Sequence, residues 1–570
     1  MRLHPSIRHA RIFTAAAAIV SMSVSAFAQS GQLSLSSALQ SAVRAAATQP
    51  PPPQQPSESV RRLSIDEAVQ LALEQNLGIR IQRIDPQISD VGVMQARSFW
   101  APNLTSSFSR NAQTQQPTNA LAGGATNILN ANVQTALGMN QFLPWGGSYS
   151  ATWNSSRATS TSNFAGFSPQ LGSNLNFQYS QPLLRNFEID QIRQQVANSK
   201  KTRELSDIQL EGVITGTLRG VKNAYWDLVY AINNLKAQQQ SLALSQQSLK
   251  DNQKRVEIGT MAPIDIVQTQ AEVASNEQGV IVADALIKQA QDNLRALILD
   301  PGTADFWNIA FDPTDAASFA EQAIDIDAAV RNALDKRSDL RGAKNTLEQS
   351  DINIKYYRNQ VRPDVNANVQ YITTAAGGAQ LSQVDLAAAA AGAAINRSII
   401  GERSFGSVLG DVLQNQYPNW TVGISIGYPL GASTAHANLA RVKLQYDEAQ
   451  IQLKNLQLQI ATQVRAAGRN VQTNQKRVQS ARASRELQEK KLEAEEKKLA
   501  AGMSSTFFVF QAQRDLSIAR VVEIQAISDY NKSLVDFEAV QQVPLNGGGG
   551  GIVTAGSGAI QTGNSAIIRQ

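Results

Sequence analysis

A very long helical pattern without proline constrains this chain more than any other feature. It runs from about Glu188 to Glu257, and its apolar residues recur every three or four positions. At about 1.5 Å per residue such a helix is roughly 105 Å long, and a second one over Thr434–Ala500 is roughly 100 Å long. A packed globule has no room for helices of this length, so we expect them to lie side by side in a coiled-coil-like array.

The chain also contains an internal duplication. When the sequence is shifted by 261 positions, residues 65–108 align with residues 326–369 without a gap. Two further matches keep the same order along the chain: Gln181–Leu183 with Tyr428–Leu430, and Arg255–Gly259 with Lys498–Gly502. Chance could supply one such match, but three in the same order indicate two related halves.

The halves are expected near 63–300 and 324–543, joined by a linker at 301–323. Each is predicted to contain a helix, strands, a very long helix, a short break and a final helix. The shorter helices of the first half, near 64–101 and 263–299, would together match the long one if stacked end to end alongside it. The shorter helices of the second half are expected near 326–362 and 504–541, and the strands begin at Pro102 and Pro363. If the helices alone are considered, a soluble spectrin-like rod is the alternative.

Both ends of the chain are expected to lie outside the packed halves. Residues 1–28 combine three arginines, a short apolar stretch and small residues at the end, which is typical of a cleaved secretory signal rather than of a membrane anchor. Residues 29–62 are rich in Pro, Gln and Ser and are predicted to be a disordered leader, and the Gly-rich residues 544–570 a disordered tail. No later run of about 18 apolar residues follows, so we expect export without a transmembrane helix.

The composition excludes most kinds of catalytic and metal-binding site. The chain has no cysteine, which excludes disulfides, thiolate metal sites and cysteine nucleophiles. His4 and His9 lie in the predicted signal, and the third histidine, His436, has no ligand partner in sequence. The formal net charge of +5 falls to near +2 without the signal, because residues 1–28 hold three arginines and no acid. We therefore expect no enzyme, no catalytic residue, no metal, no cofactor and no nucleic-acid partner.

Several segments alternate strictly between apolar and polar residues. Residues 131–143 and 148–155 do so on either side of the turn sequence Pro144–Gly147, and the pattern recurs at 173–183 and 419–430. Alternating segments of about ten residues tipped with Trp and Tyr are typical of outer-membrane barrels, although the strands alone would also suit a soluble β-sandwich. The aromatic residues expected at the membrane interface are Trp145, Trp153, Trp420 and Tyr428.

These features together resemble a TolC-type outer-membrane efflux protein. The resemblance covers about 63–543 and is carried by the duplication, the strand entries after Pro102 and Pro363, and a motif repeated where each long helix ends. It implies an α+β membrane protein, a homotrimer whose long antiparallel helices form a periplasmic tunnel and whose protomers share one β-barrel in outer-membrane lipid. It also implies a passive channel in the cell outer membrane that exports solutes or secreted polypeptide, with a periplasmic adaptor and an inner-membrane pump as partners.

The repeated motif places a basic residue and a glycine where each long helix must stop. Arg255 and Lys498 lie in the last turn, and Gly259 and Gly502 follow four residues later, as the C-terminal end of a helix favours. The resemblance implies that these residues, with Asp265, cap hairpin tips that dock the adaptor.

The resemblance also implies that the tips close the periplasmic entrance of the tunnel. In the best-known member of the family, two aspartates follow the second-half glycine by six and nine residues. Phe508 and Gln511 stand at these positions here, while Asp265 keeps an acid in the first half. We therefore expect a periplasmic constriction that is mainly apolar, formed by these three residues.

The number of barrel strands is the main departure from the family pattern, which supplies four strands per chain and twelve per trimer. The added hairpin at 129–157 predicts six strands per chain and eighteen per trimer, whereas a hairpin folded outside the membrane would leave twelve. Residues 376–418 are expected to form an extracellular loop. The six expected strands are near 103–112, 129–143, 147–157, 172–182, 364–374 and 419–430.

A periplasmic coiled-coil adaptor without a pore is the main alternative function. It would need a compact β domain without lipid-facing strands, which the alternating segments contradict. An exported enzyme would need a convergent site of polar residues, for which the sequence offers no candidate.

Overall fold

The structure, a computed structural model, describes residues 59–116, 127–162, 165–302, 306–385, 387, 397–431 and 433–542. The predicted signal, the tail and the leader up to residue 58 lie outside the described residues. Residues 59–62, assigned above to the leader, belong to strand β1 (Ser59–Leu63). This part of the leader prediction is wrong because β1 pairs in parallel with β6 (Ile309–Pro313) of the expected linker, about 250 residues away in the chain.

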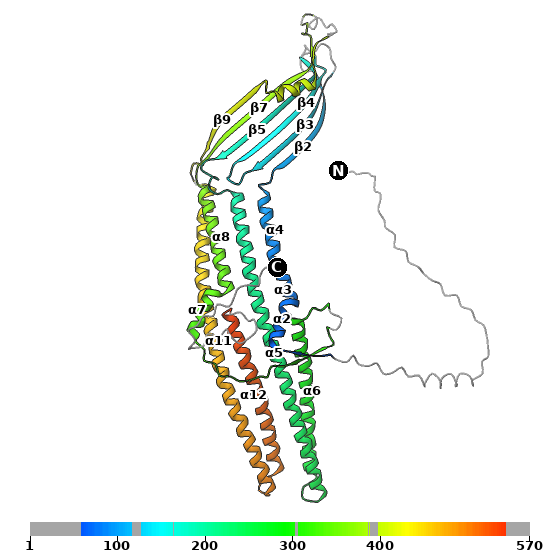
Figure 1. Cartoon of the computed structure of the whole chain (residues 1–570), viewed down its shortest axis with the longest axis vertical. Helices are drawn as coiled ribbons and strands as arrows, with labels where there is room; N and C mark the ends of the chain where they lie inside the picture. The colour runs from blue at the N-terminus through cyan, green and yellow to red at the C-terminus, as the bar shows by residue number, and fades with distance from the viewer. Residues whose placement is uncertain are drawn as a thin grey trace, which may run out of the picture. The chain divides into compact units, whose positions relative to one another are not determined.

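Two helical hairpins of equal dimensions dominate Ser59–Gln570 (Figure 1). The first consists of α5 (Gln191–Glu257) and α6 (Ile264–Ile298), and the second of α11 (Thr434–Ala500) and α12 (Thr506–Val540). Both long helices have 67 residues and both shorter ones have 35. Because α12 also packs against α5, the two hairpins lie side by side. The predicted duplication and long helices are confirmed.

The first helix predicted for each half is interrupted. Residues 64–101 form α2 (Ile65–Gln75), α3 (Leu77–Gln82) and α4 (Asp85–Ser98), while 326–362 form α7 (Ile326–Lys336) and α8 (Ser338–Gln360). The two breaks are equivalent in the duplication, at Asn76 and Arg337, whose ψ angles of 121° and 131° are extended. Asn76 stabilises its break by capping the Ile79 N–H and donating to the Leu297 carbonyl at 2.9 Å.

Each half has its own hydrophobic core on the long helices. In the first, Leu218, Val221, Tyr225 and Leu228 of α5 are buried at the spacing predicted from the sequence. In the second, Ile460, Val464, Val471 and Val478 of α11 pack with Tyr530 and Phe537 of α12. None of the described helices is both long and apolar enough to cross a membrane.

The remaining strands form one antiparallel sheet that leads directly into the helices (Figure 1). Neighbouring strands pair in the order β2, β3, β4, β5, β7, and β7 also pairs with both β8 and β9. The strands are β2 (Asn103–Gln115), β3 (Ile128–Phe142), β4 (Ser148–Ser160), β5 (Phe167–Pro182), β7 (Asp364–Leu381), β8 (Ile399–Arg403) and β9 (Pro418–Gly427).

The predicted extra hairpin, now β3 and β4, joins this sheet. Strand β3 pairs with the whole length of β2 on one side and with β4 on the other. Strand β4 in turn pairs with β5 from Ser148 to Ala158. The six predicted strands are therefore all present and all paired, and we refer to β2, β3, β4, β5, β7 and β9 as the six long strands.

The expected loop over 376–418 contains strands and a helix among its described residues, which corrects the prediction. Strand β7 continues to Leu381 and pairs there with β8, and the short helix α10 (Phe405–Leu413) follows. Val408 and Val412 of α10 are buried against Ala375 of β7 and Leu171 of β5. The alanine-rich residues 388–396 lie outside the described part of the chain.

Candidate functional site: the faces of the sheet and the tips of the hairpins

The strand register gives the sheet one apolar face. Residues that pair directly in an antiparallel sheet project to the same side, and Leu137, Trp153 and Leu175 pair in succession across β3, β4 and β5. In the single chain eleven large hydrophobic side chains of this apolar face are 37% to 77% exposed, which suits contact with lipid. They are Leu104, Phe108, Leu137, Met139, Leu175, Phe177, Val369, Trp420, Val422, Ile424 and Ile426.

The opposite face is polar and almost uncharged. Its side chains are mostly Asn, Gln, Ser and Thr, and they form hydrogen bonds across strands. Asn154 Nδ2 donates to Asn174 Oδ1 at 3.0 Å, and Asn368 Nδ2 donates to Ser425 Oγ at 3.1 Å. Along the six long strands as the structure describes them, Asp364 at the start of β7 is the only charged residue on this polar face. Such a surface can line water without strong preference for either sign of charge.

The four predicted interface aromatics do not form one cluster. Trp145 lies in the turn between β3 and β4 and its Nε1 is 3.4 Å from Tyr179 Oη, while Tyr428 follows the end of β9. Both therefore lie at the end of the sheet nearest the helices. Trp153 and Trp420 lie within β4 and β9 on the apolar face, where Trp153 Nε1 donates to a serine hydroxyl of β5.

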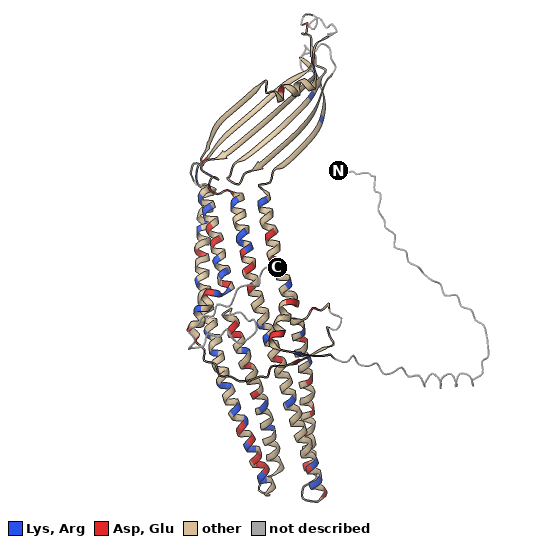
Figure 2. Ribbon diagram, in the orientation of Figure 1, with Lys and Arg blue, Asp and Glu red and all other residues tan. Residues whose placement is uncertain are grey.

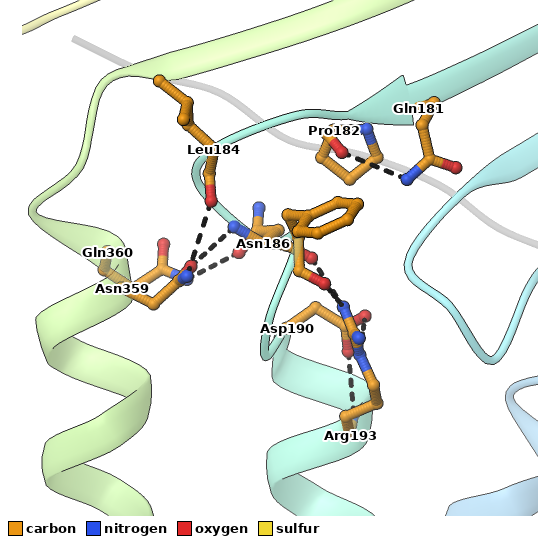
Figure 3. A network of polar contacts seen from close by, with 9 residues as sticks. Gln181, Pro182, Leu184, Asn186, Asp190, Arg193, Asn359 and Gln360 are labelled. Atoms are coloured by element: carbon orange, nitrogen blue, oxygen red, sulfur yellow. Dashed lines mark hydrogen bonds and ion pairs between the residues drawn. The ribbon is translucent and has the colours of Figure 1, made fainter.

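A polar network connects the sheet to the helices (Figure 3). Arg193, in the first turn of α5, donates to Asp190 Oδ2 at 2.9 Å and to the Asn186 carbonyl at 2.6 Å. The Asn186 N–H donates to Asn359 Oδ1 of α8 at 2.6 Å, and Gln360 Nε2 donates to Asn186 Oδ1. The network fixes how β5 enters α5 beside the end of α8. Sequence reasoning missed it, although Asp190 directly before a helical pattern is a typical N-cap.

The tips of the two hairpins have the same backbone geometry. Gly259 and Gly502 both have φ of 77°, and a Cβ at either position would meet nothing within 4 Å. In the first tip the Gly259 N–H donates to the Val256 carbonyl at 3.0 Å and the Thr260 N–H to the Arg255 carbonyl at 2.9 Å. The second tip repeats these bonds: the Gly502 N–H donates to the Leu499 carbonyl at 3.0 Å, and the Met503 N–H donates to the Lys498 carbonyl at 2.8 Å. This pattern is a Schellman motif, in which glycine supplies the left-handed conformation that ends a helix.

The first tip carries exposed aliphatic residues. Ile258 and Ile264 are 73% and 70% exposed, and Asp265 lies half-buried in the first turn of α6. Below them the buried Asn252 Nδ2 donates to Thr269 Oγ1 at 3.1 Å, which joins α5 to α6. The predicted Arg255 contributes through its carbonyl, which accepts from both the N–H and the hydroxyl of Thr260.

The second tip is aromatic at its end and has ion pairs along its side. Phe508 is 53% exposed and its ring centroid lies 5.6 Å from that of Phe507, edge to face, while Gln511 is exposed one turn further along α12. Lys498 Nζ donates to Glu495 Oε1 at 2.6 Å. This hydrogen bond, together with one from a serine hydroxyl, holds the pKa of Glu495 below its usual value.

Polar contacts join the second hairpin to the first above the tips. Arg514 Nη2 of α12 donates to Glu272 Oε2 of α6 at 2.9 Å, and the hydroxyls of Ser517 and Ser241 lie 2.8 Å apart. These four residues line a cavity of about 320 Å³ between α5, α6 and α12. The contacts join the two hairpins at this level of the helices.

Charged residues are unevenly distributed over the chain (Figure 2). Lys, Arg, Asp and Glu follow the helices closely and are scarce on the sheet. Most of those on the helices form ion pairs, as expected of a solvated coiled-coil surface. His436 lies at the start of α11, where its Nδ1 is 2.8 Å from the hydroxyl of the N-cap Ser433.

One protein family matches both halves of the chain. The family described as "Outer membrane efflux protein" matches residues 146–298 and 329–540, which include both helical hairpins. No curated protein matches the sequence significantly.

Solved structures share the fold at low sequence identity. The CmeC outer membrane channel of Campylobacter jejuni is 16% identical with a TM-score of 0.57, over 84% of this chain and 85% of that one. The outer membrane protein VceC of Vibrio cholerae is 13% identical with a TM-score of 0.56, over 85% and 96%. The MtrE outer membrane channel of Neisseria gonorrhoeae is 16% identical with a TM-score of 0.55, over 84% and 89%.

Proposed function

The chain belongs to the outer membrane efflux protein family, and we propose that three copies of it form one passive channel for solutes or secreted polypeptide. The protein is an outer-membrane efflux channel whose helical part lies in the periplasm. The two-faced sheet is the observation that carries the proposal. Closed into a barrel, it would present its apolar face to lipid and its neutral polar face to a water-filled lumen.

The sheet of one chain has two open edges that other copies could close. The outer edge of β2 is exposed along all of Asn103–Gln115, and β9 is exposed over nearly all of Pro418–Gly427. Unpaired backbone groups cost several kcal/mol each in lipid, so an open edge cannot remain there. Because the six long strands alternate in direction, β2 of one copy would meet β9 of the next in antiparallel orientation. Three chains would then form a barrel of eighteen strands.

The tips are the proposed site of docking for a periplasmic adaptor, itself coupled to an inner-membrane pump that supplies the energy. Arg255, Gly259, Asp265, Lys498 and Gly502 lie at or beside the two turns, on surfaces that the single chain leaves open. In the closed trimer, Phe508 and Gln511 of the second tip would form the constriction, with Asp265 close by. A passive duct of this kind needs no cofactor and no catalytic residue.

Cell fractionation combined with gel mobility tests the channel directly. We expect the protein in the outer-membrane fraction, as trimers that resist detergent and dissociate on boiling, and we expect ion conductance after reconstitution in planar bilayers. N-terminal sequencing of the mature protein should begin near residue 29 if residues 1–28 are a cleaved signal. Recovery of a soluble periplasmic protein without conductance would contradict the proposal and favour an adaptor.

Cysteine pairs test the strand count, because the natural chain has no cysteine. Ser107 and Ala136 pair directly between β2 and β3, so S107C with A136C should form a disulfide within one chain if β3 lies in the wall. Single cysteines on β2 combined with single cysteines on β9 should give covalent trimers in at least one register. Covalent trimers from the β2–β9 set without the disulfide between positions 107 and 136 would favour the twelve-strand alternative.

A further inference from the structure

The apolar face of the sheet carries two arginines. Arg110 of β2 and Arg157 of β4 both pair with Val133 of β3, so all three project to the same side. The strand spacing places the two arginines about 10 Å apart, on either side of that valine. Both side chains are exposed in the single chain.

These arginines have no counter-charge among the residues that the structure describes. In the part of the chain that the structure describes, neither guanidinium forms an ion pair, and no carboxylate lies on the apolar face of the six long strands. An isolated charge facing lipid is costly unless it reaches a polar group of the membrane surface or an anion. The pair therefore needs a partner from outside the chain.

Their position along the strands indicates where that partner lies. Strand β2 begins at Asn103 next to helix α4, and the end of the sheet at Gln115 and Ser160 is the one furthest from the long helices α5 and α11 (Figure 1). Arg110 and Arg157 lie in the half of their strands towards that far end. With the helices in the periplasm, this is the outer leaflet of the outer membrane.

Helix α10 lies on the apolar face, above residues that are level with Arg157 across the neighbouring strands. Leu171 pairs with Arg157 on one side and with Gly377 on the other. Gly377 allows close approach, because a Cβ there would come within 2.5 Å of Val408 Cγ2 on α10. The helix leaves Leu413 73% exposed. An apolar helix lying flat on the outward face is typical of a segment at the boundary between hydrocarbon and headgroups.

The charge of α10 itself is neutralised. Its one carboxylate, Asp411, is buried and forms an ion pair with Arg403 of the preceding strand. The helix therefore does not compete for the two free arginines. It presents an apolar surface beside the arginines that could contact acyl chains.

We propose that Arg110 and Arg157 bind the phosphate group of a lipid in the outer leaflet, with the acyl chains lying along the apolar face beside α10. Guanidinium groups suit this role because their paired N–H groups match phosphate oxygens. The proposal rests on the proposed function, since the apolar face must be in lipid and the far end of the sheet outside the cell.

Native mass spectrometry of purified trimers tests the lipid site, with phosphatidic acid as the probe and phosphatidylcholine as the lipid without an exposed phosphate monoester. We expect the wild type to bind phosphatidic acid more tightly than phosphatidylcholine. Each arginine near a membrane surface contributes about 1 kcal/mol to the free energy of binding an anionic lipid. R110Q or R157Q should therefore weaken phosphatidic acid binding roughly fivefold, and the double variant about 30-fold. R469Q, at an exposed position of α11, is the matched control and should bind as the wild type does.

Two results would overturn the lipid site. One is equal binding of both lipids by wild-type trimers, and the other is unchanged phosphatidic acid binding by the double variant. If the double variant fails to form trimers, the single variants R110Q and R157Q take its place under the same criterion, and the wild-type comparison still decides. Boiling-sensitive trimers and bilayer conductance are recorded for the same samples. Their loss in the wild type would count against the channel itself rather than against the lipid site.

Discussion

The two hairpin tips share a backbone and differ in chemistry. Helix lengths, the φ of 77° at Gly259 and Gly502, and the hydrogen bonds of the turn are the same in both. The first tip presents aliphatic side chains such as Ile258, whereas the second presents Phe508 and a set of ion pairs around Glu495. After duplication, the way in which a long helix ends has been kept while the surface at that end has diverged. The shared part serves the turn, and we infer that the diverged part distinguishes docking from closing.

The largest effect is expected from breaking what the tips share. Gly259→Val or Gly502→Val forces a β-branched residue into the left-handed region, at a cost of about 1–2 kcal/mol before the turn rearranges. A Cβ at either position would meet nothing within 4 Å, so the backbone conformation is the main source of strain. Export of a pump substrate should fall severely while boiling-sensitive trimers persist. Gly216→Ala, in the helical interior of α5 with open space around it, is the control and should export normally. Normal export by both valine variants would exclude a docking role for the tips.

The next effect concerns which tip forms the constriction. If Phe508 and Gln511 form the proposed constriction, the natural channel should show weak cation selectivity and little block by trivalent cations, because neither side chain is acidic. Apolar constrictions gate by dewetting instead. Phe508→Asp with Gln511→Asp should create strong block by a trivalent cation in single-channel recordings. Gln268→Asp, which adds an acid near Asp265 in the first tip, should produce much less.

A smaller effect is expected from separating the two hairpins. The pair between Arg514 and Glu272 is exposed on the arginine side, with side-chain exposures of 62% and 17%, so it should be worth no more than about 1 kcal/mol. Arg514→Ala should raise the resting conductance several-fold, by loosening the second hairpin from the first. Arg514→Lys retains the charge and should behave almost as the natural protein does. A resting conductance unchanged by Arg514→Ala would mean that the remaining contacts between the hairpins, such as the one between Ser517 and Ser241, hold them together without this ion pair.

Sequence patterns predicted the features of this fold that depend on neighbouring residues. The helix ends at Gly259 and Gly502 were predictable because glycine stops a helix locally, and the two sheet faces because alternation is a local property. The break at Asn76 was not, since it depends on a hydrogen bond to a carbonyl more than 200 residues away. Helix α10 was not predictable either, because its buried residues pack against Leu171 and Ala375 of other strands.

The same limit applies to the candidate site. The residues at the tips could be chosen from the repeat, but their partners could not. The ion pair of Arg514 and Glu272 joins residues 242 positions apart, and no spacing rule connects them. The pairing of Arg110 and Arg157 across Val133 also becomes visible only once the strand register is known.

The smallest expected effect is a difference between the two tips in how much local stability they lose at acidic pH. In the second tip, hydrogen bonds from Lys497 and Lys498 lower the pKa values of Glu493 and Glu495, whereas no ion pair joins residues within 252–269 of the first tip, all of which the structure describes. A carboxyl group with a lowered folded-state pKa contributes stability that is present above its unfolded value, near 4.5, and lost as the pH falls through the folded value. The protection factors for amide hydrogen exchange, which allow for the pH dependence of intrinsic exchange, should therefore fall below about pH 4.5 around residues 493–505, and by more than around 252–262. Glu493→Gln with Glu495→Gln should remove the difference, and an equal loss of protection at both tips of the natural protein would show that these ion pairs do not order the second tip.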